Sequence, residues 1–396
     1  MNEKAVDNSK RTVDDINEVL SLAKLKESDL LPTSQMIYFT QDLHQNQYKL
    51  LELDKYLEQV LKQGDCLYIK GDDEENAVLC TKSKTYDLLE TETSNSLLLM
   101  NNLKFHDSLK NDSMRNVSKT TIRTTFHDYL EVIPGKPRLK KLKELLKKAV
   151  YKGPENEYEI NKNSLFTYDE LLDKIQASEE EFVIALKALN TITIDNKLRI
   201  LDFEYNFRIL SYMLKLIDEN SWQLDEVDYE ETMNALSELI PTNVLNNLFD
   251  LYAEESKVID GLQLYRYNEE KVCRFFAQVL LYSAGKFNLD EFLQAWRESV
   301  PEGMVATEDM LHGIAIIDRK SIPNVIWAFH EENLPENINE RFQVLFEAKE
   351  KWTVNEIAPY IQNLTTEKFD VSALLAKYTR TSTIQGTKYY SSKHSK

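Results

Sequence analysis

The stretch TYDELLDKIQASEEEFVIALKALNTITIDNKLRILDF, residues 167–203, decides the fold of the larger part of this chain. Thr167 and Ser178, both good helix-capping residues, each precede a short segment with apolar residues at helical spacing. Two segments of alternating polarity follow, turned at Asp195-Asn196. Two short helices followed by a β-hairpin are typical of a winged helix-turn-helix. The expected helices are 168–176, 179–190 and 207–219, and the expected strands are 191–194 and 198–203.

The same unit recurs later in the chain. A second hairpin is expected at 313–318 and 325–330, turned around Arg319-Lys320-Ser321 and preceded by a helix at 289–300. A last copy would use helices 355–364 and 371–378 and a wing around Gly386. Residues 224–267 are either a fourth, degraded copy or an extension of the first; helices near 229–239 and 242–253 and a strand at 262–267 are expected there. The sequence therefore predicts three winged-helix units.

Before about residue 135 the chain has a different character. A helix is expected at 13–26, where Thr12 and Asp15 form a start of capping-box type, and another at 55–63, ending at Gly64. Short β-type segments dominate the rest, so this part predicts a small, incomplete barrel or sandwich. An open sheet leaves unpaired edges, which partner strands commonly cover. The expected strands are 36–39, 48–53, 66–70, 77–80, 85–89 and 97–100.

Pro134-Gly135 marks the end of the β domain, and a strongly basic helix, 138–150, follows it. Gly153-Pro154 then opens a polar linker. The fold class is therefore α+β, with an N-terminal barrel-like domain completed by partner chains and a mostly helical array of tandem winged helices. The predicted domains are 1–135 (β domain), 136–165 (basic helix and linker), 166–265 (first winged helix and extension), 266–334 (second) and 335–396 (third).

The composition limits the function. The formal net charge is −18, so phosphate is repelled by the chain as a whole and nucleic acid must bind at local basic patches. The three cysteines are not at metal-ligand spacing and predict free thiols in a reducing compartment. No phosphate-binding glycine loop, nucleophile elbow or histidine pair is visible. We therefore expect no enzyme, no cofactor and no membrane anchor.

Two segments oppose the global charge and are candidate DNA contacts. The basic helix contributes Lys140 and Lys141; its lysines equally suit a solvated face of an amphipathic helix. After Asp370 the chain has no acidic residue, and aromatic rings alternate with cations there, as in proteins that contact phosphates and bases. The wing tips, with Arg199 in the first unit, are further candidates. The tail contributes Lys377, Arg380, Lys388 and Lys393, and the second wing contributes Arg319 and Lys320.

Several blocks of sequence, collinear over nearly the whole chain, are more specific than any single motif. The most specific is SVPEGMV (299–305) with Ile317-Asp-Arg319. The others are IKGD (69–72), AVLC (77–80), KTYDL (84–88), KPRLKKLK (136–143), LLDKIQASEE (171–180), RILDF (199–203), Lys351-Trp352 and IAPYI (357–361). Together these blocks resemble one eukaryotic family, the sister chromatid cohesion subunit of the alternative replication factor C clamp loader.

The resemblance implies partners and a location. The N-terminal strands would pair with a small chromosome-transmission-fidelity subunit and with the C-terminus of the loader's large subunit. The assembly would dock on the catalytic subunit of DNA polymerase epsilon, near the first winged helix, in the nucleus. The C-terminal units would bind the DNA backbone without sequence specificity, and the sliding clamp would be contacted only indirectly. Candidate partner-interface residues are Ile69, Ala77, Leu79, Tyr86 and Leu88.

Two other functions compete with this interpretation. The first is a winged-helix scaffold of the proteasome-lid type, in which the units bind protein and never DNA. The second is a hydrolase or nuclease that uses the dispersed carboxylates, which would show metal-dependent turnover. DNA binding by the tail, lost on replacing Arg380 and Lys388, would separate the adaptor from the lid-type scaffold.

Overall fold

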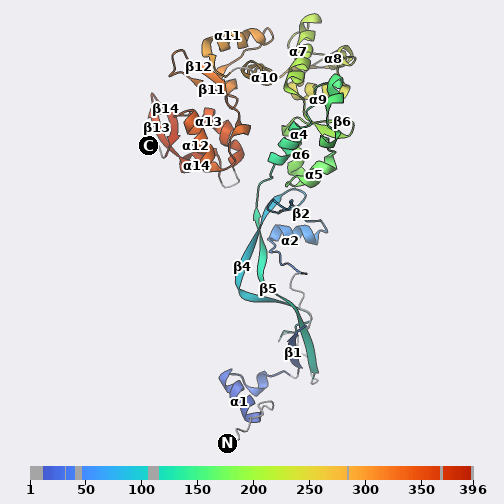
Figure 1. Cartoon of the computed structure of the whole chain (residues 1–396), viewed down its shortest axis with the longest axis vertical. Helices are drawn as coiled ribbons and strands as arrows, with labels where there is room; N and C mark the ends of the chain where they lie inside the picture. Colours follow the sequence, from blue (N-terminus) through green and yellow to red (C-terminus); the bar gives the residue numbers. More distant parts are fainter. Residues whose placement is uncertain are drawn as a thin grey trace. The chain divides into compact units, whose positions relative to one another are not determined.

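The structure is a computed structural model, which describes residues 12–31, 33–40, 47–105, 116–282, 285–365 and 369–393 (Figure 1). It has mixed helices and strands, which confirms the α+β class. The chain divides into two compact units. One consists of Met1–Lys143 and Asp169–Ala185, and the other of Glu144–Tyr168 and Leu186–Lys396. Residues 169–185 of the expected first winged helix thus cluster with the N-terminal strands, while the domain borders themselves stay a prediction.

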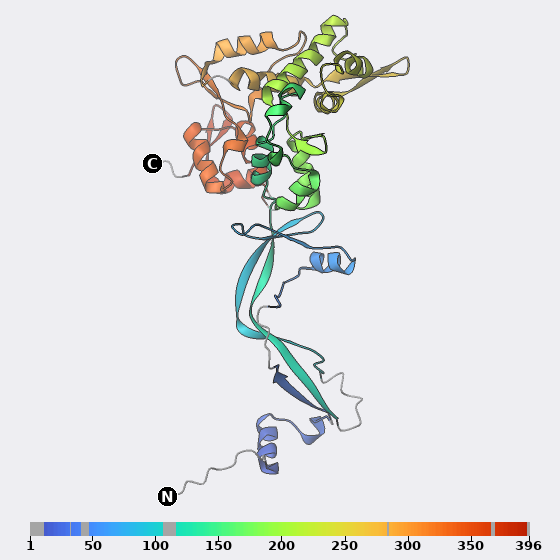
Figure 2. The same ribbon diagram turned by 45° about the vertical axis from the view of Figure 1, so that its right-hand side comes forward.

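The first unit is built on an open five-stranded sheet with the order β1-β5-β4-β3-β2. Its two long antiparallel strands, β4 and β5, make a twisted ribbon that is visible in Figure 2. The edge strand β1 runs parallel to β5, and β2 is the other edge. The two edge strands do not pair with each other in the described part of the chain, so no closed barrel forms there. The strands are β1 (Thr33–Phe39), β2 (Tyr68–Lys70), β3 (Val78–Cys80), β4 (Thr85–Met100) and β5 (Asn116–Pro134).

Two expectations for these strands were wrong, and one strand was not predicted. The segments 85–89 and 97–100 are the two ends of the single strand β4. Residues 48–53 form no strand; only Leu51 makes an isolated bridge, with Leu130. The strand β5 was missed altogether, because the side chains that it buries are half threonine (Thr120 and Thr124), which reads as polar sequence.

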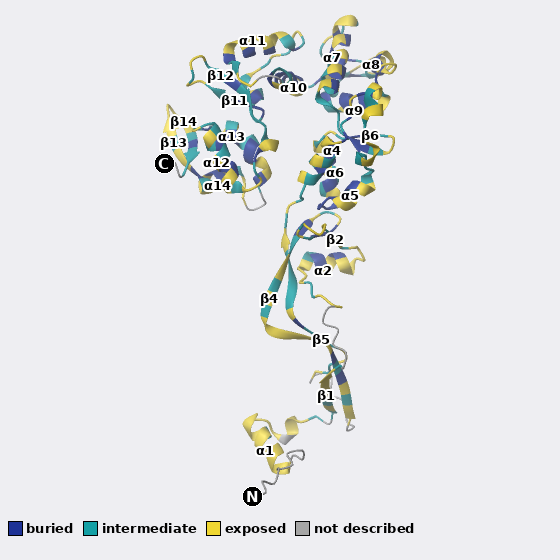
Figure 3. Ribbon diagram, in the orientation of Figure 1, coloured by how far each residue is buried: buried dark blue, intermediate teal, exposed yellow. Residues whose placement is uncertain are grey.

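Two helices accompany the sheet. The first, α1 (Val13–Leu22), is shorter than expected, and its Thr12–Asp15 capping box is confirmed. All of its residues are exposed or partly exposed, as the yellow colour in Figure 3 shows. The second, α2 (Lys55–Lys62), packs Leu57 against Leu79 and Tyr86, which form a small core with it.

A polar joint fastens the helices α5 (Tyr168–Lys174) and α6 (Glu179–Ala188) to the sheet. The Lys70 ammonium donates to the carbonyl oxygens of Leu172 and Ala177 at 2.7 and 2.8 Å. Thr85 Oγ1 donates to Glu181 Oε2 at 2.5 Å. Burial lowers the pKa of Lys70. Because charge-assisted hydrogen bonds are among the stronger ones, this joint explains why the helix pair clusters with the strands.

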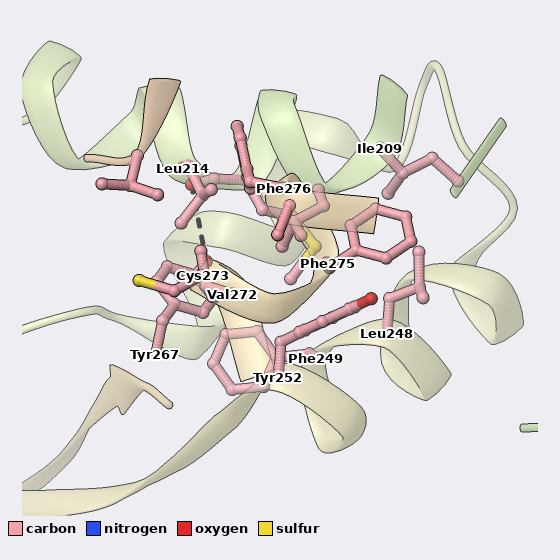
Figure 4. Packing of buried hydrophobic residues seen from close by; sticks show 14 of the residues in the cluster. Ile209, Leu214, Leu248, Phe249, Tyr252, Tyr267, Val272, Cys273, Phe275 and Phe276 are labelled. Carbon is pink, nitrogen blue, oxygen red and sulfur yellow. Dashed lines mark hydrogen bonds between the residues drawn. The ribbon is translucent and has the colours of Figure 1, made fainter. Parts of the chain in front are cut away.

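The second unit is mostly helical and has two cores. The larger one gathers residues from α7, α8, α9, α10 and α11, and Figure 4 shows its aromatic centre around Phe249, Tyr252, Phe275 and Phe276. Trp296 is fully buried in this core. The helices are α7 (Phe203–Glu219), α8 (Tyr229–Leu236), α9 (Thr242–Tyr252), α10 (Glu269–Tyr282) and α11 (Leu289–Ser299).

Three hairpins accompany these helices. The first two are β6 (Ile192–Ile194) with β7 (Lys197–Arg199), and β8 (Ala253–Ile259) with β9 (Leu262–Tyr267). The third is β11 (Ala315–Asp318) with β12 (Val325–Ala328), to which the short β10 (Phe287–Asn288) adds. The sequence predicted the first and third hairpins but missed β8 and α10. Short helical turns occupy the expected linker, at Pro154–Glu159 and Lys162–Ser164.

The last core holds the C-terminal elements together around Trp352, which is 1% exposed. It contains α12 (Ile338–Ala348), α13 (Val354–Ile361) and α14 (Val371–Tyr378), followed by the hairpin β13 (Thr379–Ile384) and β14 (Thr387–Ser392). Three helices and a hairpin are the element order of a winged helix; the assignment to that fold stays a prediction for all three units. No helix in the described ranges is both long and apolar enough to span a membrane.

Candidate partner and nucleic-acid interfaces

The sheet of the first unit has two long edges without a neighbouring strand in the described ranges. The β4 strand pairs with β3 only at Thr85–Asp87, so from Leu88 to Met100 its one neighbouring strand in the described ranges is β5, with a break in the register between Glu92 and Leu97. The whole outer edge of β1 is likewise free of any strand among these residues. A two-stranded ribbon is only marginally stable by itself, so such edges favour the addition of a strand.

Exposed apolar side chains follow the same edges. On β1, Met36, Ile37 and Phe39 are each more than half exposed. On β4, Leu89 and Leu97 are 47% and 41% exposed. Because successive residues of a strand point to opposite faces, both faces of β1 present apolar surface. Water is a poor environment for such strands, and a partner would bury them.

The five candidate interface residues fall into different classes. Ile69 lies on the edge strand β2 and is 63% exposed, so it can meet a partner. Leu79 and Tyr86 are 1% and 2% exposed and belong to the core of the sheet, so they present no surface. Burial raises the pKa of Tyr86 to about 12. Ala77 and Leu88 are partly buried, and Leu88 packs against the same core.

The basic helix is α4 (Lys140–Lys147), shorter than expected. Lys140 is exposed and makes no ion pair with any described residue. Lys141 is engaged, because its ammonium contacts the carboxylates of Asp72 and Glu75. Arg138, just before the helix, pairs with Asp87 at 2.6 Å. Of the cations named here, Lys140 therefore faces solvent, and Lys141 and Arg138 are held by the β domain.

The hairpin predicted as the wing of the first winged helix does not present a free cation. Arg199 is 1% exposed and forms a two-pronged ion pair with Glu157, at 3.0 and 3.1 Å. It also donates to the carbonyl oxygens of Ala149 and Val150. The expectation of phosphate contact at Arg199 was therefore wrong, because all the donor nitrogens face protein acceptors. In the second wing, Arg319 and Lys320 are exposed but paired, with Glu308 and Glu350 respectively.

The terminal hairpin separates two of the predicted DNA contacts. Cross-strand partners share a face, so the register Thr383↔Lys388 and Thr381↔Tyr390 places Lys388 on the face of the buried Tyr390. The Lys388 ammonium lies 5.3 Å from the centre of the Tyr390 ring. Arg380 lies opposite Ser391, on the other face, and is exposed. A rigid duplex that contacts one face reaches only one of the two cations.

The remaining predicted contacts lie beside α14. Lys377 is exposed, and its ammonium is 5.3 Å from the centres of both the Phe369 and the Tyr378 rings. Lys393 donates to the carbonyl oxygens of Ala376 and Lys377, at the end of that helix. The structure thus brings Lys377 and Lys393 together, and the aromatic neighbours predicted from the sequence lie among these cations.

One surface was not found from the sequence. On α6, which would be the recognition helix of the first predicted winged helix, Ile184 is 65% exposed beside the exposed Glu180. An apolar side chain next to a carboxylate suits a protein contact better than phosphate. The signal was present in the sequence, as an isoleucine out of phase with Phe182 and Leu186 on the same helix.

No cluster of His, Cys, Asp or Glu in the described ranges could hold a metal ion. Cys80 and Cys273 are buried free thiols, and Cys66 is an exposed one. Burial raises the pKa of the Cys273 thiol to about 11. This thiol therefore stays protonated near neutral pH and is a poor nucleophile.

Open sheet edges, exposed apolar strand residues and surface cations are the surface features of the described residues that suit contacts with other macromolecules. The chain belongs to the Dcc1 family: the family model "Sister chromatid cohesion protein Dcc1" matches residues 48–361. The chain is 41% identical to sister chromatid cohesion protein DCC1 of Homo sapiens, over 97% of this chain and 99% of the human protein. It is 28% identical to the probable DCC1 of Dictyostelium discoideum and 22% to DCC1 of Saccharomyces cerevisiae, over 88% and 84% of this chain and 94% and 93% of those proteins. The family description names a cohesion protein and no enzymatic activity.

Proposed function

We propose that this chain is a non-catalytic adaptor in sister chromatid cohesion, a subunit of the cohesion-type alternative replication factor C clamp loader that acts in the nucleus. It tethers the loader to DNA polymerase epsilon and to DNA, so that the sliding clamp is loaded at replication forks. Family membership supports the role in cohesion. The observation that carries the adaptor role is the open sheet, whose β4 edge from Leu88 to Met100 has no neighbouring strand in the described ranges.

In this proposal, strands of the small chromosome-transmission-fidelity subunit and of the large subunit's C-terminus add to the β4 and β1 edges. Main-chain hydrogen bonds give such an interface its affinity, and pockets for alternate side chains give its specificity. Leu89 and Leu97 on β4, and the exposed residues of β1, would then be buried. The edge at β2 is a poorer acceptor, because Gln176 already donates to the Lys70 carbonyl oxygen there.

Introducing charged side chains at the β4 edge tests this interface. The full chain is mixed with the purified small subunit and the large subunit's C-terminal segment, and complex formation is measured by light scattering. The variant Leu89→Lys, Leu97→Lys is expected to weaken assembly at least about tenfold, since each lysine must be desolvated. Leu239→Lys, at a position 68% exposed outside the sheet, is the matched control and should assemble normally. Normal assembly of the β4 variant would refute the proposed edge.

The first helical pair is proposed to contact the catalytic subunit of DNA polymerase epsilon. Ile184 is exposed on α6 beside Glu180, and an apolar side chain next to a carboxylate favours protein over DNA at this helix. Ile184→Glu should reduce binding to the purified polymerase subunit, while Leu239→Glu should not. Equal binding by the two variants would exclude this surface.

DNA binding is proposed for the terminal unit and α4, through backbone contacts only. Because the chain carries −18 charges, the affinity should be low and should fall steeply with salt. Arg380 and Lys388 lie on opposite faces of the hairpin, so a duplex on one face contacts only one of them. The double variant Arg380→Ala, Lys388→Ala should therefore bind DNA no more weakly than the weaker-binding single variant. Additive losses would show that DNA wraps both faces, and unchanged binding would favour the lid-type scaffold.

A further inference from the structure

An acidic turn lies against the basic helix α4. Residues Asp72-Asp73-Glu74-Glu75 connect β2 to β3, and Glu75 N donates to Asp72 O at 3.0 Å to close the turn. The Lys141 ammonium contacts an Asp72 carboxylate oxygen and both Glu75 oxygens, the latter at 3.3 and 3.4 Å. These bonds raise the pKa of Lys141 and hold the pKa of Asp72 below its usual range.

A second contact fixes the same turn. The Arg138 guanidinium donates to the carbonyl oxygen of Asn76, the residue after the turn, at 2.7 Å, and to Gln176 Oε1 at 3.1 Å. The turn is therefore attached to the start of α4 at two points, through Arg138 and through Lys141. This position does not depend on the ion pair of Lys141 alone.

The contact removes one cation from a cationic surface. At about 100° per residue, Lys140 and Lys141 are neighbours on the exposed side of α4, whereas Lys143 lies about 160° from Lys141, on the other flank of the helix. Lys140 makes no ion pair with any described residue, whereas the Lys141 side chain is 30% exposed and paired. Carboxylate oxygens occupy Lys141 in the way that phosphate oxygens would.

We propose that the turn 72–75 is an intramolecular competitor of DNA: its carboxylates hold Lys141, and a duplex must displace them to use the full basic face of α4. This inference rests on the proposed DNA binding by α4 and adds its regulation. The turn leaves weak, salt-sensitive binding through Lys140, and removal of its charge exposes a second contact, Lys141, on the same side of the helix.

The size of the effect follows from counterion release. Each phosphate contact on duplex DNA adds about 0.9 to the slope of log K against log salt, so one released lysine is worth about eightfold in affinity at roughly 0.1 M monovalent salt. A change in overall charge without a new contact shifts affinity but leaves the slope nearly unchanged, because screening acts on all variants alike.

The turn itself offers a matched control. Asp72→Asn, Glu75→Gln removes the two carboxylates that touch Lys141. Asp73→Asn, Glu74→Gln removes the same net charge from the same turn, at exposed positions that make no ion pair with any described residue. Each full-length variant is titrated against a labelled, mixed-sequence duplex by fluorescence anisotropy, between roughly 0.05 and 0.2 M salt. Thermal unfolding checks that each variant is folded.

We expect the first variant to bind about eightfold more tightly at roughly 0.1 M salt, with a slope steeper by about 0.9, and the control to keep the wild-type slope. Adding Lys141→Gln to the first variant should abolish the gain. Equal gains and slopes for the two double variants, or no gain at all, would overturn the competitor. If the wild type binds and the first variant gains nothing, only this inference fails. If no variant binds at the lowest salt, the proposed DNA contact of α4 fails with it.

Discussion

Replacing Arg199 distinguishes a structural arginine from a DNA contact. Arg199→Ala removes the two-pronged pair with Glu157 and the donors to Ala149 and Val150, all in a site where the arginine is 1% exposed. Breaking a buried ion pair costs about 3–5 kcal/mol, and we expect about 3 kcal/mol because the Glu157 side chain is 34% exposed and can be rehydrated. For a unit of this size that loss lowers Tm by roughly 6–12 °C.

The assay is thermal unfolding by circular dichroism beside DNA binding by anisotropy. Arg199→Lys keeps the charge but not the planar fork, so it should recover only part of the stability. Both variants should bind duplex like the wild type at a temperature where they are folded. A variant with wild-type Tm and clearly weakened DNA binding would refute the structural role and show that Arg199 contacts DNA.

Further predictions concern the sheet core and the terminal unit. Leu79→Ala should cost about 2–5 kcal/mol, measured by urea unfolding, because the side chain is buried in the sheet core; Ile69→Ala, at an exposed edge, should stay within about 0.5 kcal/mol of wild type. At Glu356, burial favours the neutral form, but the Lys349 ammonium and the Thr353 cap outweigh it and hold the pKa below 4.5. The stability that this carboxylate gives is therefore complete above the unfolded pKa and is lost as pH falls through the folded pKa. Between about pH 5 and pH 3, Tm should fall less for Glu356→Gln than for the wild type.

Local signals predicted local structure well. The Thr12–Asp15 box begins a real helix, and helix α14 has the bounds that the sequence predicts. The strand β5 was not predicted because it lacks an alternating pattern of apolar residues: it buries threonines beside Ile122 and Phe126. Helix α10 was not predicted because its buried side chains lie on several sides of the helix, so its apolar residues do not form one amphipathic face.

Site residues were harder to predict, because their environment is set by distant parts of the chain. Arg199 has the sequence of a wing cation, and only Glu157, 42 residues earlier, makes it structural. Lys141 has the sequence of a phosphate contact, and Asp72, 69 residues earlier, occupies it. Leu79 and Tyr86 form the core because α2 packs on them, which strand periodicity alone could not indicate.

Hydrogen–deuterium exchange of the full chain, alone and with the small subunit and the large subunit's C-terminal segment, tests the open sheet most directly. We predict that the amides on the outer side of Leu88–Met100 and Thr33–Phe39 exchange quickly in the chain alone, since β5 pairs with only the other side of each strand in the described ranges, and that they slow markedly in the complex. Tight binding without added protection of either edge, or strong protection of both in the chain alone, would contradict completion of this sheet by partner strands.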